Sequence, residues 1–178
     1  MQTRRARWTA RILDGLTVAL LAAAAALFLD ARGGGAQPQA PLPTLERGAP
    51  VPAVQVARAD GAREALLAAP SVPGHLVLFF RTDCPVCAQQ RPAWTELAAR
   101  ARAAGWYVTG VTTERLAPAA TGYLGSGLRV VQMDVAAAQR LRTTVVPTTL
   151  AARADGTVLL HHHGLLAASG TDSITRAF

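Results

Sequence analysis

The chain has 178 residues, a hydrophobic fraction of 51% and a formal net charge of +7. This length accommodates one domain of ordinary size with some chain left over, and the hydrophobic fraction excludes wholesale disorder. All 18 basic residues are arginine, and they are scattered along the chain rather than clustered on one helix or interleaved with aromatic residues. We therefore expect a solvated basic surface and no nucleic-acid partner.

Residues 12–29 form an apolar run, ILDGLTVALLAAAAALFL, with a single charge near its start. As an α-helix rising about 1.5 Å per residue, this run would span about 27 Å, close to the hydrocarbon thickness of a bilayer. The flank before it is strongly basic, whereas the flank after it carries only Asp30 and Arg32. The asymmetry predicts a cytoplasmic tail over 1–11, a single-pass anchor in the bacterial inner membrane over 12–29, and a domain on the periplasmic side.

A cleaved signal peptide is the alternative interpretation of the same segment, because Gly34-Gly35-Ala36 offers small residues for cleavage. Asp30 and Arg32 stand awkwardly before that site, and the apolar run is longer than a usual signal core, so we favour the anchor. Residues 30–49 are rich in Gly, Pro, Gln and Ala, which predicts a linker. Both interpretations export the domain that follows, residues 50–178.

Strand and helix patterns alternate along residues 50–178. Residues 76–80 are continuously apolar, which is typical of a strand buried on both faces, and Asp155-Gly156 predicts a hairpin turn. A strand–helix–strand unit followed by an antiparallel hairpin predicts an α/β fold with a central mixed sheet flanked by helices. The predicted strands are 51–56, 76–80, 106–111, 128–131, 145–151 and 158–162, and the predicted helices are 84–105, 118–124, 135–141 and 171–178.

The two cysteines of the chain, Cys84 and Cys87, stand close together in the motif Cys-Pro-Val-Cys. Thiol–disulfide exchange requires an accessible thiolate and a second thiol that resolves the mixed disulfide. The pair lies at a predicted helix start, where backbone N–H groups stabilise negative charge, with Thr82 or Asp83 as the expected cap. We therefore predict Cys84 as the attacking nucleophile and Cys87 as the resolving thiol. No second CxxC or HxxxH supplies further zinc ligands, so we expect no metal and no cofactor.

Two prolines complete a recognisable pattern. Pro92 lies inside the predicted helix, five residues after Cys87, and Pro147 stands at the start of a predicted strand. With the CPVC motif in this order and spacing, residues 49–164 resemble thioredoxin-fold proteins of the membrane-anchored, TlpA-like type of periplasmic thiol-disulfide oxidoreductase. The resemblance implies a thioredoxin-like fold, a cis peptide bond at Pro147 beside the two sulfurs, and substrate binding by Val146 and Pro147. It also implies a periplasmic client protein with a thiol or disulfide, a membrane electron donor, and reduction as the expected direction.

The sequence departs from this family in the groups that would handle the proton of Cys87. Leu78 stands where thioredoxin has a buried Asp, and Gln90 stands where related TlpA-like proteins have a Glu. Glu114, just past the end of a predicted central strand, is a candidate on position alone, with a solvated loop acid as the alternative.

Asp83 replaces the familiar Trp before the first cysteine. Its charge disfavours a thiolate on Cys84, whereas Arg81 and the helix N-terminus favour one. Asp83 and Glu114 are therefore interpreted as modulators of the site, and the redox direction stays open at this point.

Three consecutive histidines, His161, His162 and His163, lie on the predicted strand 158–162 and at its end. Side chains on a strand alternate between faces, so the three cannot converge on one ion, and surface histidines are the simpler interpretation. The alternative function is a copper-binding chaperone, in which His163 would lie near Cys84 and Cys87, because Cu(I) favours soft thiolate ligands.

Overall fold

A computed structural model describes residues 17–26, 28, 42–69, 71–125 and 127–177. The chain divides into two compact units, Met1–Pro41 and Leu42–Phe178. Within the first unit, residues 17–26 are helical, and the rest of the predicted anchor, apart from residue 28, lies outside the described residues. Across the described ranges, no helix is both long and apolar enough to cross a membrane.

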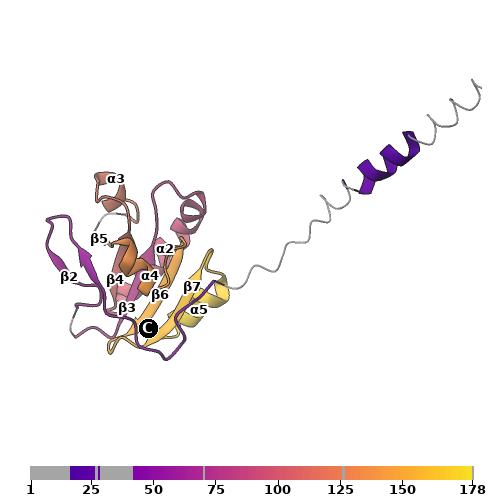
Figure 1. Cartoon of the computed structure of the whole chain (residues 1–178). Helices are drawn as coiled ribbons and strands as arrows, with labels where there is room; N and C mark the ends of the chain where they lie inside the picture. Colours follow the sequence, from indigo (N-terminus) through magenta and orange to yellow (C-terminus); the bar gives the residue numbers. More distant parts are fainter. Residues whose placement is uncertain (1–16, 27, 29–41, 70, 126, 178) are drawn as a thin grey trace, which may run out of the picture. The chain divides into compact units, whose positions relative to one another are not determined.

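The second unit is built on a seven-stranded sheet in the order β2-β1-β5-β4-β3-β6-β7 (Figure 1). Strands β3, β4 and β5 are parallel. Strand β6 runs antiparallel to β3, β7 runs antiparallel to β6, and β1 pairs antiparallel with β2 and β5. This is the mixed sheet that the sequence predicts. The strands are β1 (Gln55–Ala57), β2 (Arg63–Ala65), β3 (Gly74–Phe79), β4 (Tyr107–Thr112), β5 (Arg129–Gln132), β6 (Thr148–Arg153) and β7 (Val158–His163).

Helices cover both faces of this sheet (Figure 1). Successive side chains of a strand point to opposite faces of the sheet. The side chains of β3, and of Phe80 directly after it, therefore belong alternately to two separate hydrophobic cores. Leu76, Leu78 and Phe80 pack with the long helix α2, whereas Val77 and Phe79 pack with the short helix α4. The helices are α2 (Pro85–Ala103), α3 (Pro118–Thr121), α4 (Val135–Arg140) and α5 (Ala168–Thr175).

Some predicted boundaries are wrong. Helix α5 begins at Ala168 rather than at residue 171, without a side-chain cap, and α3 ends at Thr121 rather than at 124. The predicted linker over 30–49 extends too far, since residues 42–49 belong to the second unit. Leu45 packs against the core on the α4 side and donates its N–H to His161 Nδ1 at 2.7 Å. The packing of Leu45 and its hydrogen bond to His161 join segments far apart in the chain, so local composition could not reveal them.

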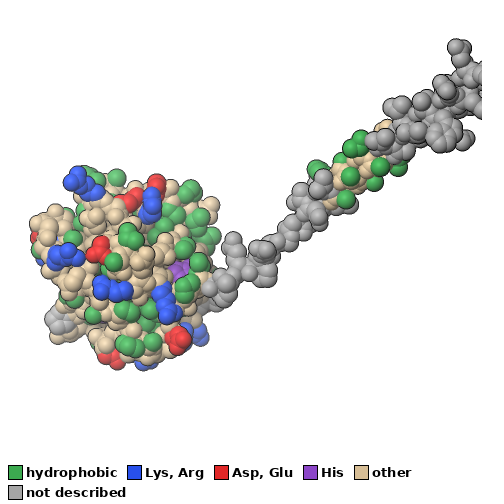
Figure 2. All heavy atoms as spheres, in the orientation of Figure 1, with side chains coloured by type: hydrophobic (Ala, Val, Ile, Leu, Met, Phe, Trp, Pro, Cys, Tyr) green, Lys and Arg blue, Asp and Glu red, His purple; other side chains and the backbone are tan. Residues whose placement is uncertain are grey.

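Charged side chains of both signs are dispersed over the face of the domain that Figure 2 shows. Some charged side chains of the domain pair locally, including Arg58 with Asp60 and Arg100 with Glu96. The net positive charge is therefore spread over this face rather than gathered into one patch.

Candidate active site

The two cysteines lie at the N-terminus of α2. Cys84 is the N-cap residue, with extended backbone angles (φ −89°, ψ 111°), and its sulfur accepts a hydrogen bond from the Cys87 N–H at 3.1 Å. The expected capping by Thr82 or Asp83 is wrong, because the Cys84 sulfur itself takes that position. Pro85 occupies the first turn, where no backbone donor is lost. A half-exposed thiol thus sits where unpaired helix N–H groups point outward.

The segment before β6 approaches Cys84 from the other side. The peptide bond between Val146 and Pro147 is cis, as the resemblance implies. The Cys84 Sγ lies 3.8 Å from the carbonyl oxygen of Val146 and donates to it. Thr148 Oγ1 donates to the Val145 carbonyl oxygen at 2.6 Å, which ties the loop to the first residue of β6. The structure therefore brings together the four predicted residues Cys84, Cys87, Val146 and Pro147.

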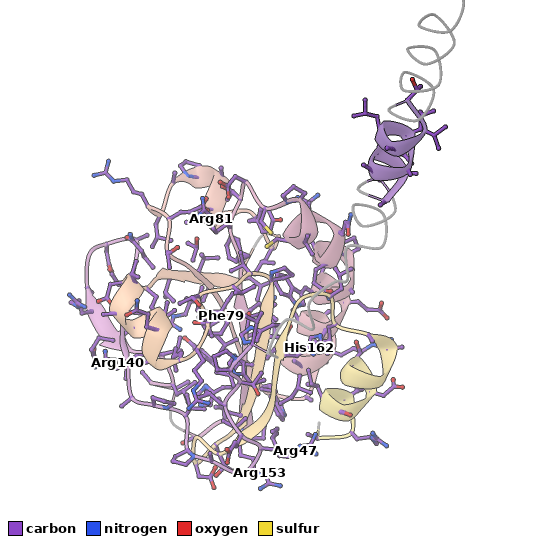
Figure 3. The ribbon with its side chains drawn as sticks, turned by 45° about the vertical axis from the view of Figure 1, so that its right-hand side comes forward. Arg47, Phe79, Arg81, Arg140, Arg153 and His162 are labelled. Atoms are coloured by element: carbon purple, nitrogen blue, oxygen red, sulfur yellow. The ribbon has the colours of Figure 1, made fainter. Side chains whose placement is uncertain are left out.

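Figure 3 places this region within the domain. Arg81 lies at the upper end of the sheet, Phe79 lies deeper inside, and Arg153 lies at the opposite end. Strand β3 runs from its Gly74–Arg153 pair towards its Phe79–Thr148 pair, so it delivers the loop 81–84 to the same edge as the start of β6. The site is at the carboxyl end of β3.

Cys87 differs sharply from Cys84 in its surroundings. Its side chain is fully buried (0% exposed), within the core that includes Phe80 and Trp94. Burial raises the pKa of the Cys87 thiol to about 12, and the hydrogen bond with Cys84 adds to this, while the backbone of Arg81 opposes it. Cys87 is therefore a neutral thiol at neutral pH in the reduced protein.

Arg81 and Asp83 form a bidentate ion pair just before the cysteines. Arg81 Nε and Nη2 donate to the two carboxylate oxygens of Asp83 at 2.9 and 2.7 Å. The hydrogen bond with Arg81 lowers the pKa of Asp83, so the carboxylate stays ionised. Both side chains are exposed. The opposing charges that the sequence places near Cys84 therefore neutralise each other in large part.

Glu114 lies beside the loop that precedes the cysteines, where it holds Thr82. Its carboxylate accepts from the Thr82 N–H at 2.9 Å and from the Thr82 hydroxyl at 3.1 Å. The Glu114 N–H in turn donates to Thr112 Oγ1 at 3.1 Å, at the end of β4. These bonds join the carboxyl end of β4 to the active-site loop. They give Glu114 a positioning role that the sequence did not reveal, since Thr82 is 32 residues away.

Gln90, one turn beyond Cys87 on α2, is buried. Its Oε1 accepts from the Leu166 N–H at 2.8 Å, while its Nε2 finds no partner among the described residues. The amide thus ties α2 to the segment before α5. At this position the resemblance would have placed a carboxylate.

The three histidines bond with different partners. His163 bonds with Thr148 Oγ1 at 2.7 Å and with the Pro43 carbonyl oxygen at 3.2 Å, and His162 bonds with the Leu165 carbonyl oxygen at 2.9 Å. The rings of His161 and His163 lie 4.8 Å apart, as alternate residues of one strand should. Over the described part of the chain, no cluster of three His, Cys, Asp or Glu side chains could hold a metal ion. The structure thus offers no support for the copper alternative.

A largely apolar cavity of about 130 Å³ adjoins the site. Val146 and Arg81 form part of its wall, and the wall continues over the ends of the central strands to Val135 at the start of α4. Val135 is 63% exposed, which is unusual for a large aliphatic side chain in this domain. Because Val146 lines this cavity, a peptide bound in extended form beside Val146 could place a side chain in it.

No family model matches the sequence, and a comparison with curated proteins finds no match. The fold, however, is similar to solved structures. The thioredoxin domain of a thiol-disulfide oxidoreductase from Bacteroides vulgatus matches with a TM-score of 0.61 at 15% identity, over 75% of this chain and 98% of that one. A thiol:disulfide interchange protein from Bacteroides sp. matches with a TM-score of 0.59 at 17% identity, over 74% and 87% of the two chains.

A peroxiredoxin-like protein from Aquifex aeolicus also matches, with a TM-score of 0.59 at 14% identity, over 76% of this chain and 90% of that one. Proteins with different chemistry thus share this architecture, so the likeness shows the fold and the site must supply the function. Residues 42–177 have a thioredoxin-like fold, the fold of these thiol-disulfide oxidoreductases.

Proposed function

We propose that this protein is a membrane-tethered protein thiol-disulfide oxidoreductase that reduces client disulfides with Cys84 and Cys87. The observation that carries the proposal is the contrast between the two thiols. Cys84 is half-exposed at a helix N-terminus beside the Val146 carbonyl, whereas Cys87 is buried one turn further in. Thiol–disulfide exchange needs one attacking and one resolving thiol in this arrangement.

The reaction then proceeds in two exchanges. The Cys84 thiolate attacks one sulfur of the client disulfide, that bond breaks, and the leaving client sulfur takes up a proton. Cys87 next loses its proton and attacks Cys84 Sγ, which releases the second client sulfur as a thiol. The client gains two electrons and the protein becomes the Cys84–Cys87 disulfide.

Reduction is the direction that the environment of Cys87 supports. A strongly oxidising thiol pair owes its potential to a reduced form that is stabilised, commonly as a thiolate. Here burial keeps Cys87 protonated, and the guanidinium of Arg81 is already occupied by Asp83. These features add little stabilisation to the reduced form, so the pair should give up its electrons readily.

A client protein would bind in extended form along Val146, with a side chain in the adjoining apolar cavity. Val146 combines a carbonyl next to the Cys84 sulfur with a place in the cavity wall. Val135→Asp puts a charge at the rim, so it should slow reduction of a protein disulfide severalfold while leaving that of a small soluble disulfide unchanged. Equal slowing of both substrates would contradict docking at this cavity.

Membrane attachment and partners belong to the same proposal. The apolar run 12–29, preceded by a basic tail, supports an inner-membrane anchor with the domain on the periplasmic side. A tethered periplasmic reductase requires a membrane electron donor to restore its dithiol. Retention of the intact chain in the membrane after alkaline extraction is the expected result, and release of a shortened chain would favour the cleaved signal peptide.

Trapping of the mixed disulfide tests the proposed function. The Cys87→Ser variant cannot resolve, so it should accumulate a covalent complex with a disulfide-bonded client that reducing agents release. The matched variant Cys84→Ser should form no such complex. Equal trapping by both variants, or by neither, would contradict the assigned roles.

A further inference from the structure

Tyr123 carries a buried hydroxyl group that has no hydrogen-bond partner among the described residues. The residue lies in the loop after α3, and its side chain as a whole is half-buried. Proteins rarely leave a buried hydroxyl unpaired, because such a group forfeits its bond to water without compensation. An unpaired hydroxyl in a native core therefore calls for a functional explanation.

The ring of Tyr123 is held in a defined orientation. It stacks parallel on Phe80, with centroids 4.7 Å apart and planes inclined by 4°. The guanidinium carbon of Arg91 lies 5.5 Å from the centre of the same ring. Offset stacking and a cation over the ring both stabilise this placement. The position of the ring is thus held by the residue after β3 on one side and by α2 on the other.

Both contacts place Tyr123 on the same side of the sheet as Cys87. Arg91 is four residues beyond Cys87 on α2, and residues at this spacing share one helix face. Phe80 directly precedes Arg81, whose backbone acts to lower the pKa of the Cys87 thiol. Phe80 and Cys87 belong to one buried cluster, against which both Tyr123 and Cys84 pack. The aromatic ring therefore packs against the buried cluster that contains the resolving sulfur.

The hydroxyl is a hydrogen-bond donor rather than a base in this setting. Burial raises the pKa of Tyr123, and charge on Cys87 raises it further, as do smaller effects of Cys84 and Glu114. The positive charge of Arg91 opposes this rise in the pKa. At neutral pH the phenol accordingly keeps its proton and can offer it to a neighbouring anion.

We propose that the Tyr123 hydroxyl donates a hydrogen bond to the Cys87 thiolate that forms while the mixed disulfide is resolved. The inference rests on the proposed function, in which Cys87 passes its proton to solvent and its sulfur attacks Cys84 Sγ. The bond from Cys84 to the client then breaks, and the client sulfur takes a proton from solvent. Tyr123 stays protonated throughout. The hydrogen bond from Tyr123 lowers the barrier to resolution, because the hydroxyl gains its acceptor only once the Cys87 thiolate has formed.

The test uses the purified full-length chain and the small disulfide 5,5′-dithiobis(2-nitrobenzoate), which releases a coloured thiolate in each of the two exchanges. The first release depends on reagent concentration and reports attack by Cys84. The rate of the second release is independent of reagent concentration and reports resolution by Cys87. In Tyr123→Phe we expect an unchanged first phase and a second phase slowed roughly tenfold at pH 7, since a hydrogen bond to a charged group is lost. The pH profile of the second phase should move by about one unit to higher pH.

Tyr107→Phe is the matched control, because Tyr107 is the other tyrosine of the chain and lies on β4 beside Arg129. Both of its phases should match the wild type. Tyr123→Phe should melt at the wild-type temperature or above, because it removes a hydroxyl without a described partner. An unchanged second phase in Tyr123→Phe, or equal slowing of both phases, would overturn the inference while leaving the proposed function intact. A wild-type chain without a second phase would overturn the proposed function as well.

Discussion

The sulfur of Cys84 lies 3.8 Å from the carbonyl oxygen of Val146, although the two residues are 62 positions apart in the chain. The contact joins the N-terminus of α2 to the loop before β6. It leaves one thiol half-exposed at the edge of the sheet, while Cys87 is enclosed behind it. A difference in reactivity between the two thiols follows directly.

Alkylation should distinguish the two cysteines. In Cys87→Ser, iodoacetamide should modify Cys84 readily, whereas in Cys84→Ser it should modify Cys87 more slowly by at least about tenfold at pH 7. Burial excludes the reagent from Cys87, and its pKa of about 12 leaves almost no thiolate to react. Mass spectrometry over time gives both rates, and equal rates would contradict the assigned difference in access.

The ion pair between Arg81 and Asp83 should tune the alkylation rate of Cys84 in opposite directions. Asp83→Ala leaves the guanidinium free to attract negative charge on the neighbouring sulfur, so the rate should rise about two- to threefold. Arg81→Ala leaves the carboxylate alone and should lower the rate by a similar factor. Both effects should shrink in about 1 M salt, because exposed charges are screened there. Shifts of the same sign in the two variants would contradict this account.

A buried hydrogen bond between Trp94 and Thr149 should contribute measurably to stability. Trp94 Nε1 donates to Thr149 Oγ1 at 2.9 Å, and both side chains are fully buried. Thr149→Val keeps the shape but leaves the indole N–H unpaired, so the free energy of unfolding should fall by about 1–3 kcal/mol. Urea unfolding gives this value. Thr95→Val, at an exposed position on α2, is the control and should change it by less than about 0.5 kcal/mol.

His161 should make the domain less stable in acid. Its Nδ1 accepts from the Leu45 N–H, and burial together with nearby positive charge lowers its pKa to about 4. In the unfolded chain the imidazole titrates near 6.5, so between about pH 6.5 and 4 the unfolded state binds the extra proton. Stability is therefore full above this range and declines as the pH falls through it, by roughly 1–2 kcal/mol after screening by solvent.

His161→Asn provides the comparison, because the Asn side-chain oxygen can accept the same N–H without titrating. The difference in unfolding free energy between pH 7 and pH 4.5 should be smaller in this variant than in the wild type. An equal acid dependence in the two proteins would show that His161 does not cause it.

The sequence predicted those parts of this fold that depend on local pattern. The continuous apolar run of β3, the long helix after Cys84 and the Asp155-Gly156 hairpin carry their own signals, and the structure contains all three. The cis peptide bond at Pro147 could be predicted only from the family resemblance, because most X–Pro bonds are trans.

What the sequence missed depends on contacts between distant segments. The bonds from Thr82 to Glu114 and from Leu45 to His161 span 32 and 116 positions. The stacking of Tyr123 on Phe80 is of the same kind, since nothing in the surrounding residues marks that tyrosine. A cap formed by a cysteine sulfur was also unexpected, because Ser, Thr, Asp and Asn dominate helix N-caps.

A redox titration of the purified protein tests the central claim most directly. The fraction of free Cys84 and Cys87 is measured by thiol trapping after equilibration at a series of potentials. We predict one reversible two-electron transition to the intramolecular disulfide, at a potential near that of thioredoxin, about −270 mV. A potential near that of DsbA, about −120 mV, would contradict the reductase direction. Failure to form the Cys84–Cys87 disulfide at any potential would contradict the redox function itself.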